Sequence, residues 1–405
     1  MLDASQAAFL LVLRSALTGK PCPCDSIADS DMLCRVLFLS DIHELCPLIC
    51  QSLYQHPVVK SHGAIFSRYR NKSVQSVSSQ IVHTAEFLQL YQKMGKAGLK
   101  PLVVKGIVLR SLYPKGSFRP SVDEDLLIAP EEKEIFSAFL MRQGLFPSEG
   151  NAESDSYEIS YLDSDTHLCI ELHKSLFPPD SNAYGDLNHL FDGVLDRTVE
   201  VQIEDVKLRT LAPTDHLLYL ICHAYKHFLH SGVGIRQVAD MALFSNAYGG
   251  DIDWEHIYRA CKSVNIETFT AALFQIAHKH LTMNEIPAPF VGIEVDEQPL
   301  LEDILSGGLY GTVDIDRVHS GNMTLDAVAA QKQGRRGSGV WHSLFPGAAY
   351  LQGHFPYAKK HPILLPLAWA QRLGNYLARS NTSSPAETIR IGQARIDLLK
   401  QYKVI

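Results

Sequence analysis

The feature that most constrains the fold is a change in hydrophobic periodicity near residue 98, which reverses near residue 213. Before and after this block, apolar residues recur every three or four positions, as on one face of an α-helix. Within it, short apolar runs end at glycine, proline or acidic turns, which is typical of β-strands. The sequence therefore predicts an α+β fold with a strand-rich middle between two helical regions.

The same change in periodicity suggests how the chain is divided. We expect an N-terminal helical region at 1–97, an α+β core at 98–212 and a helical bundle at 213–306. The remainder, 307–405, is expected to hold a flexible connection and a C-terminal helical region. Residues 307–340 are rich in glycine, serine and charge, and we interpret them as the mobile part of that connection.

Individual elements follow from the local pattern. The expected strands are residues 101–106, 123–128, 156–162 and 168–172, with a strand or hairpin at 198–208. The expected helices of the flanking regions are 62–95, 214–230, 234–246, 254–263 and 267–280, and two shorter helices are expected at 107–113 and 130–143.

Composition restricts the class of protein and its compartment. Of the 405 residues, 46% are hydrophobic and 20% are charged, as in an ordinary globular protein. With a net charge of −7 the chain could still bind nucleic acid through a local basic patch, but nothing in the sequence indicates one. No apolar run reaches the roughly 18 residues of a membrane span, and the N-terminus does not resemble a signal peptide. The eight cysteines form no CxxC pair, so we expect reduced thiols in the cytoplasm rather than disulfides or a metal site.

A pair of aspartates lies at the start of one expected strand. Residues two apart on a strand point to the same face, so Asp123 and Asp125 project together. Neighbouring carboxylates repel each other unless a cation such as Mg²⁺ lies between them. Glu171 is a single acid within another apolar strand, and a position beside the aspartates would explain it. The pattern predicts a metal site formed by three carboxylates; the alternative is that the aspartates belong to a solvated acidic turn.

The segment Val103-Val-Lys-Gly106 ends an expected strand at a glycine, directly before a short helix. Backbone N–H groups at such a helix start can bind a phosphate. Lys105 and Arg119 could form ion pairs with phosphate oxygens. We therefore interpret Lys105, Gly106 and Arg119 as candidate nucleotide-binding residues.

In combination, these motifs resemble a known family, the uncharacterised bacterial nucleotidyltransferases of the polymerase-beta-like superfamily. The resemblance is carried by Lys105-Gly106-x-x-Leu109-x-x-x-Tyr113-Pro114, Arg119, Asp123-x-Asp125-Leu-Leu, Ile170-Glu171-Leu172-His173, and His223-x-x-x-His227 with Arg236 and Asp240. Residues 355–372 also look like the C-terminal part of that family, so the resemblance spans most of the chain.

The resemblance implies a small mixed sheet flanked by helices, and a transfer of a nucleoside monophosphate from an NTP to an acceptor with release of pyrophosphate. It implies that Asp123 and Asp125 hold Mg²⁺, and that Glu171 helps to orient or deprotonate the acceptor. The acceptor stays open between a small molecule, a protein and an RNA. Two residues depart from the superfamily pattern: Ile107 follows Gly106 where Ser or Gly is usual, and Glu124 separates the aspartates where an apolar residue is common. We expect Glu124 to face the opposite side of the sheet, where it needs a partner or solvent.

Four histidines fall on one stripe of the expected helix 214–230, within roughly 60° of one another at about 100° per residue: His216, His223, His227 and His230. Three interpretations are open. The stripe could be a wall of the nucleotide site, with Arg236 reaching phosphate and Asp240 fixing Arg236 or a histidine. It could be a structural hydrogen-bond network, or it could bind zinc through His223 and His227, although no third ligand is evident.

Three functions fit the sequence. The first is a Mg²⁺-dependent nucleotidyltransferase. The second is a catalytically degenerate protein of the same fold that serves as a nucleotide-binding or regulatory module, because Ile107 provides no hydroxyl after Gly106. The third is a phosphotransferase that uses the same acids. The sequence does not distinguish the preferred NTP or the oligomeric state.

Overall fold

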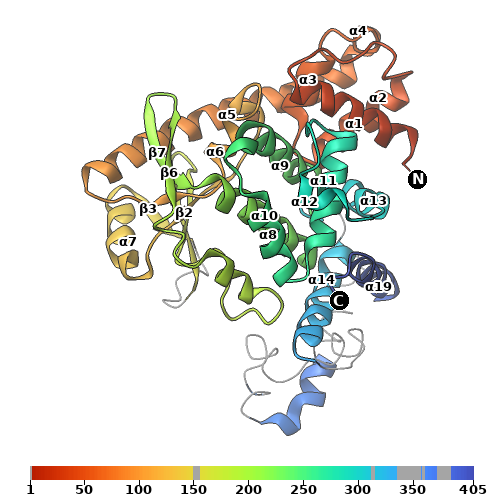
Figure 1. Cartoon of the computed structure of the whole chain (residues 1–405). Helices are drawn as coiled ribbons and strands as arrows, with labels where there is room; N and C mark the ends of the chain where they lie inside the picture. The colour runs from red at the N-terminus through yellow and green to blue at the C-terminus, as the bar shows by residue number, and fades with distance from the viewer. Residues whose placement is uncertain (1, 149–155, 312–314, 335–356, 358–360, 372–384) are drawn as a thin grey trace.

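The computed structural model describes residues 2–148, 156–311, 315–334, 357, 361–371 and 385–405. Within these residues the strands form one mixed seven-stranded sheet with helices around it (Figure 1). The predicted α+β fold, a mixed sheet flanked by N-terminal and C-terminal helical regions, is confirmed.

The helices that come before the sheet are α1 (Ala4–Leu17), α2 (Ser30–Ile42), α3 (Cys46–Leu53), α4 (Pro57–Ser61) and α5 (Gly63–Lys96). The central block contains α6 (Ile107–Arg110), α7 (Lys133–Arg142) and the strands β1 (Leu102–Val103), β2 (Asp123–Leu127), β3 (Leu145–Pro147), β4 (Glu158–Asp163), β5 (Cys169–His173), β6 (Thr198–Ile203) and β7 (Val206–Leu211). The later helices are α8 (Pro213–His230), α9 (Ile235–Tyr248), α10 (Trp254–Ser263), α11 (Glu267–His280), α12 (Ala288–Val291), α13 (Gln298–Gly307), α14 (Ile315–Lys332) and α19 (Pro385–Gln401).

The strand order is β3-β4-β5-β2-β1-β7-β6, so β2 lies at the centre of the sheet. It pairs with β5 in parallel and with β1 in antiparallel orientation, and β1 pairs with β7 in parallel. After the half-buried Asp123, every residue of β2 is buried, as expected for a strand covered on both faces. This central strand carries the acidic motif, so its side chains are held rigidly.

Helix α5 connects two hydrophobic clusters. Its N-terminal part contributes Phe66 to a cluster that joins α1–α3 to α8–α13, and its C-terminal part contributes Phe87 to a second cluster against the sheet and α7. Gly98, with a φ of 80°, follows the helix in the left-handed conformation that often terminates helices. Figure 1 shows α5 running past the sheet toward the N-terminal helices.

The prediction for residues 307–340 is wrong where the structure describes them. Residues 307–340 were expected to form a mobile connection, but Ile315–Lys332 is helix α14, packed against α8 and α19. The helix is stabilised by buried polar contacts that its hydrophilic sequence does not reveal: Arg317 donates to the carbonyl of Ser231 at 2.5 Å, and Thr388 of α19 donates to Asp316 at 2.6 Å. Tertiary contacts therefore outweigh the weak local pattern.

Among the described residues, no helix is both long and apolar enough to cross a membrane. The C-terminal segment 355–372, which contributes to the family resemblance, lies partly outside the described residues.

Candidate active site

Asp125 and Glu171 lie side by side on adjacent parallel strands. The register of β2 and β5 pairs Asp125 with Glu171 and Asp123 with Cys169. Because residues in register project from the same face of a sheet, the two carboxylates converge. The structure thus brings Glu171 beside the aspartate motif, as the sequence pattern predicts.

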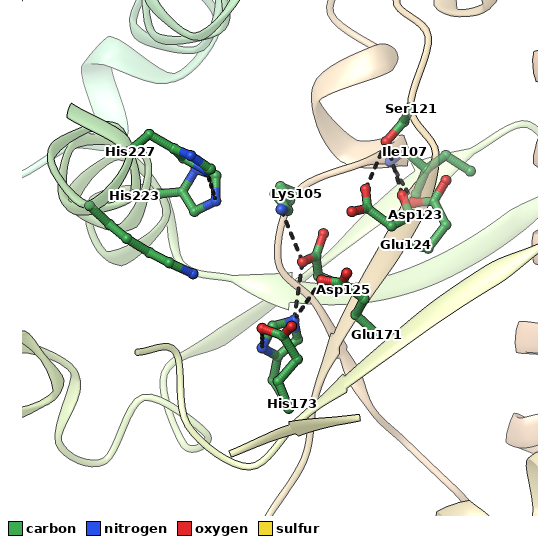
Figure 2. A network of polar contacts seen from close by, with 12 residues as sticks. Lys105, Ile107, Ser121, Asp123, Glu124, Asp125, Glu171, His173, His223 and His227 are labelled. Carbon is green, nitrogen blue, oxygen red and sulfur yellow. Dashed lines mark hydrogen bonds and ion pairs between the residues drawn. The ribbon is translucent and has the colours of Figure 1, made fainter. Parts of the chain in front are cut away.

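His173 joins this pair, and sequence reasoning assigned it no role. One possible ligand atom from each of Asp125, Glu171 and His173 lies within 4.8 Å of the others. His173 Nε2 is 3.1 Å from Asp125 Oδ1 and 3.5 Å from Glu171 Oε2 (Figure 2). The signal was present in the sequence, because Glu171 and His173 are two residues apart on one strand and share a face.

The predicted set of Asp123, Asp125 and Glu171 differs from this group in one member. Asp123 does not belong to the group of donors within 4.8 Å. It lies at the start of β2, half-buried, where the Ser121 hydroxyl donates to its backbone carbonyl at 2.9 Å and lies 3.4 Å from its Oδ1. Among the described residues, the metal-ligand atoms that converge belong to Asp125, Glu171 and His173, which we call the acid cluster.

Lys105 provides the compensating charge next to Asp125. Its Nζ lies 3.0 Å from Asp125 Oδ1. Burial alone would raise the pKa of Asp125, but the Lys105 ammonium and the His173 ring outweigh it and hold that pKa below its ordinary value. Burial would lower the pKa of His173, but its hydrogen bonds to Asp125 and Glu171 raise it to about 9. Asp125 is thus an anion between two cations at neutral pH.

The second oxygen of Asp125 is unsatisfied. Oδ2 is buried and has no hydrogen-bond partner among the described residues. A buried carboxylate oxygen without a partner is costly, and a bound cation is one way to satisfy it. Carboxylates and a neutral imidazole are established protein ligands for divalent ions, so this group could hold a metal ion if His173 gives up its proton on binding.

Glu124 occupies the helix start that the sequence suggested for a phosphate. Its side chain turns away from Asp125 and accepts a hydrogen bond from the backbone N–H of Ile107 at 2.9 Å, and Arg110 pairs with its other oxygen. The prediction that Glu124 faces the opposite side and needs a partner is confirmed. The Ile107 donor is consequently taken by a carboxylate of the chain itself, which argues against a phosphate there.

Gly106 is explained by this contact. Its φ is 49°, and a Cβ at this position would lie 2.1 Å from Glu124 Oε2. We expect Gly106→Ala to lower the free energy of unfolding by about 1–3 kcal/mol, because the residue would be strained and the buried Glu124 would be displaced. Urea denaturation measures this.

Gly95→Ala is the matched control, because a Cβ at this helical position meets nothing within 4 Å. It should leave the free energy of unfolding unchanged or raise it by up to about 1 kcal/mol. Equal effects of the two substitutions would contradict the role assigned to Gly106.

The family described as "uncharacterised nucleotidyltransferase" matches residues 34–282, which is more than half of the chain. The chain belongs to this family. No curated protein and no solved structure matched the chain. The matched range includes the aspartate motif, Glu171, His173 and helix α8, and it ends before the C-terminal segment that also looked similar.

In this member of the nucleotidyltransferase family, Arg119 is engaged within the protein. Its Nε and Nη2 each donate at 2.7 Å to one oxygen of Asp240, and the Tyr113 hydroxyl donates to Asp240 at 2.7 Å. All three side chains are buried. The prediction that Asp240 fixes Arg236 or a histidine is therefore wrong: Asp240 fixes Arg119. The three residues join α9 to the loop before β2.

Arg236 is also held by the protein. Its Nη1 donates to Glu44 Oε2 and to the carbonyl oxygen of Pro120, both at 2.9 Å. The guanidinium therefore anchors the loop that leads into Asp123 and does not extend freely toward a phosphate. Arg119 and Arg236 act on the site through the position of this loop, a relation that only tertiary structure could reveal.

The four histidines of α8 do not form one network. His223 and His227 contact each other through Nε2 at 3.2 Å, and His227 stacks on Tyr310. His230 contacts the Tyr184 hydroxyl at 2.7 Å, and His216 lies against Phe244. In Figure 2, His223 and His227 lie on α8 across from Lys105 and the acids. His223 and His227 therefore stay candidates for a wall of the site, whereas His216 is packed in the core. Among the described residues, neither member of the pair belongs to a group of three metal ligands.

Because His216 is buried as a neutral ring, its protonation should oppose folding. Burial lowers its pKa to about 4, compared with about 6.5 in the unfolded chain. Between these values the unfolded state binds the proton more tightly, so stability decreases as the pH falls from about 6.5 to 4, by about 3 kcal/mol in total. We expect His216→Gln to reduce this acid sensitivity in urea titrations at pH 7 and pH 5, and identical pH dependence of both proteins would contradict it.

Proposed function

We propose that this protein is a Mg²⁺-dependent nucleotidyltransferase that moves a nucleoside monophosphate from an NTP to an acceptor and releases pyrophosphate. The observation that supports it best is the pairing of Asp125 with Glu171 on adjacent strands of a chain from the nucleotidyltransferase family. The resemblance of the aspartate motif further suggests a place in the polymerase-beta-like superfamily. The acceptor is a small molecule, a protein or an RNA.

The donor set fits a divalent cation. Asp125 and Glu171 provide the hard carboxylate oxygens that Mg²⁺ prefers, and the unpartnered Asp125 Oδ2 offers a free ligand atom. Asp123 lies outside the convergent group but projects from the same strand face, so we propose it as a further ligand. When bound, Mg²⁺ would neutralise charge on the phosphates of the substrate.

The other residues of the cluster bind and orient. A bound cation would compete with Lys105 for Asp125 and weaken their ion pair. The Lys105 ammonium would then be available to an anionic phosphate oxygen. Glu171 is the most accessible member of the convergent group: its side chain is 22% exposed, against 1% for Asp125 and 6% for His173. It is therefore the group best placed to accept a hydrogen bond from an incoming acceptor. His173 holds both carboxylates in position.

One observation favours the second candidate, a nucleotide-binding module without catalysis. The Ile107 N–H, which a phosphate would use in the sequence-based interpretation, is bound by Glu124. A protein with this arrangement could bind NTP through the remaining cations and yet lack a donor needed for transfer.

The experiment that separates the candidates is incubation with each α-³²P-labelled NTP, Mg²⁺ and a cell extract that supplies acceptors, with pyrophosphate measured in parallel. Label transfer with release of pyrophosphate supports the enzyme. NTP binding without turnover supports the module, and release of ADP would identify a phosphotransferase. Absence of both binding and transfer for every NTP would refute the proposal.

A further inference from the structure

Lys226 is a cation that belongs neither to the sequence motifs nor to the acid cluster. It lies on α8 three residues after His223, and residues three apart share one face of a helix. Its Nζ is 3.4 Å from the Tyr157 hydroxyl and 5.8 Å from the centre of that ring. The Tyr157 ring in turn lies 6.2 Å from the ring of His173. Lys226 is thus connected to the acid cluster by one intervening aromatic residue.

The charge of Lys226 is not balanced by a close partner. The side chain is half-buried, and within the part of the chain that the structure describes no carboxylate forms an ion pair with it. Lys105 differs, because Asp125 lies 3.0 Å from it. Burying an ammonium without a counter-ion is unfavourable, and an anionic ligand bound beside it would supply one.

The electrostatic surroundings of Lys226 are those of the active site. Burial lowers the pKa of Lys226; Glu158, Glu171 and Asp125 act against that effect, and Lys105 adds to it. The same Lys105 also disfavours protonation of His223 and His227. Two lysine ammonium groups and the acid cluster therefore share one electrostatic environment, with a neutral histidine pair beside them. A ligand that takes up both ammonium charges and a divalent cation must itself carry several negative charges.

We propose that Lys226 is a binding residue for the polyphosphate of the nucleotide, sharing its charge with Lys105 and the divalent cation. This inference rests on the proposed function and deepens it by assigning part of the substrate to α8. A polyphosphate satisfies the requirement because its negative charges are spread over adjacent groups. Charge-assisted hydrogen bonds from lysine or arginine to phosphate are among the stronger polar contacts in proteins.

The test uses inorganic tripolyphosphate with Mg²⁺, since this probe contains the part common to every NTP. Its affinity for the full chain is measured by isothermal titration calorimetry, for the wild type, Lys226→Met and Lys226→Arg. We expect the dissociation constant to rise by about 10- to 100-fold in Lys226→Met and to be largely restored in Lys226→Arg. Methionine is an unbranched side chain of similar length, so the substitution removes mainly the charge.

Lys207→Met is the matched control, because Lys207 is 71% exposed on β7 and its ion pair with Glu200 spans 3.6 Å. It should bind tripolyphosphate as the wild type does. Binding of Mn²⁺, followed by electron paramagnetic resonance, and the melting temperature should be unchanged in Lys226→Met, which a merely structural role of Lys226 would not predict.

Two results would overturn the inference in distinguishable ways. If the wild type and Lys226→Met bind tripolyphosphate and NTP equally, Lys226 is not a phosphate ligand, and the proposed function stands. If the wild type binds neither tripolyphosphate nor any NTP, the proposed function fails and the assignment of Lys226 fails with it.

Discussion

Replacing Asp125 with asparagine should reduce nucleotide transfer by at least about a thousandfold. The carboxylate is the shared partner of Lys105 and His173 and the neighbour of Glu171 in the parallel register. Its loss would remove a ligand of the proposed metal ion, and metal stabilisation of a transferring phosphoryl group is worth several kcal/mol, at 1.36 kcal/mol for each factor of ten. Label transfer from an α-³²P NTP measures the change.

A second readout follows the metal itself. Mg²⁺ should raise the melting temperature of the wild type and not that of Asp125→Asn, because a ligand that binds only the folded state stabilises it. Asp205→Asn, in the exposed turn between β6 and β7, is the control and should behave as the wild type in both assays. Retention of more than about a tenth of the transfer rate by Asp125→Asn would exclude its assigned role.

The same assay decides between the two possible ligand sets. If the predicted carboxylates hold the metal, Asp123→Asn should abolish the Mg²⁺-dependent rise in melting temperature. If the convergent group of the structure holds it, His173→Ala should do so, and Asp123→Asn should act mainly on transfer. An unchanged metal response in both variants would leave Asp125 and Glu171 as the ligands.

Replacing Asp240 with asparagine should lower the free energy of unfolding by about 3–5 kcal/mol, because it leaves the buried Arg119 without its counter-ion. An asparagine amide would also place an NH₂ group against a guanidinium donor, and Tyr113 would lose part of its acceptor. Urea denaturation measures the change. Because the ion pair between Arg119 and Asp240 is buried, we expect this to be among the largest single-residue effects in the chain.

Removing both charges should be less harmful than removing one. The double variant Arg119→Met, Asp240→Leu leaves no isolated buried charge, so we expect it to recover part of the stability lost in Asp240→Asn. Asp251→Asn, exposed after α9, is the control and should change the free energy of unfolding by no more than about 0.5 kcal/mol. If Asp240→Asn costs less than about 1 kcal/mol while Arg119→Met weakens NTP binding at full stability, Arg119 is a phosphate ligand after all.

The local pattern was enough to predict most elements of the fold. Helices α10 and α11 have the predicted bounds. Helix α5 is shifted by one residue at both ends, and α8 begins one residue earlier than predicted. The pairing of β4 with β5 follows from two apolar runs and the turn between them. These elements are recognisable because an amphipathic helix and an alternating strand repeat their signal over many residues. Helix α14 was missed because its stability depends on buried polar contacts with distant residues.

For the site, the sequence by itself determined which residues share a face. The two-residue spacing of Asp123 and Asp125, and the isolation of Glu171 in an apolar strand, are properties of the chain that any correct sheet must respect. Only the tertiary structure decided what meets across elements: β5 rather than another strand beside β2, Glu124 on the Ile107 N–H, and Arg119 on Asp240. The physical reason is that strand periodicity is local, whereas strand order and buried ion pairs depend on how segments far apart in the chain pack together.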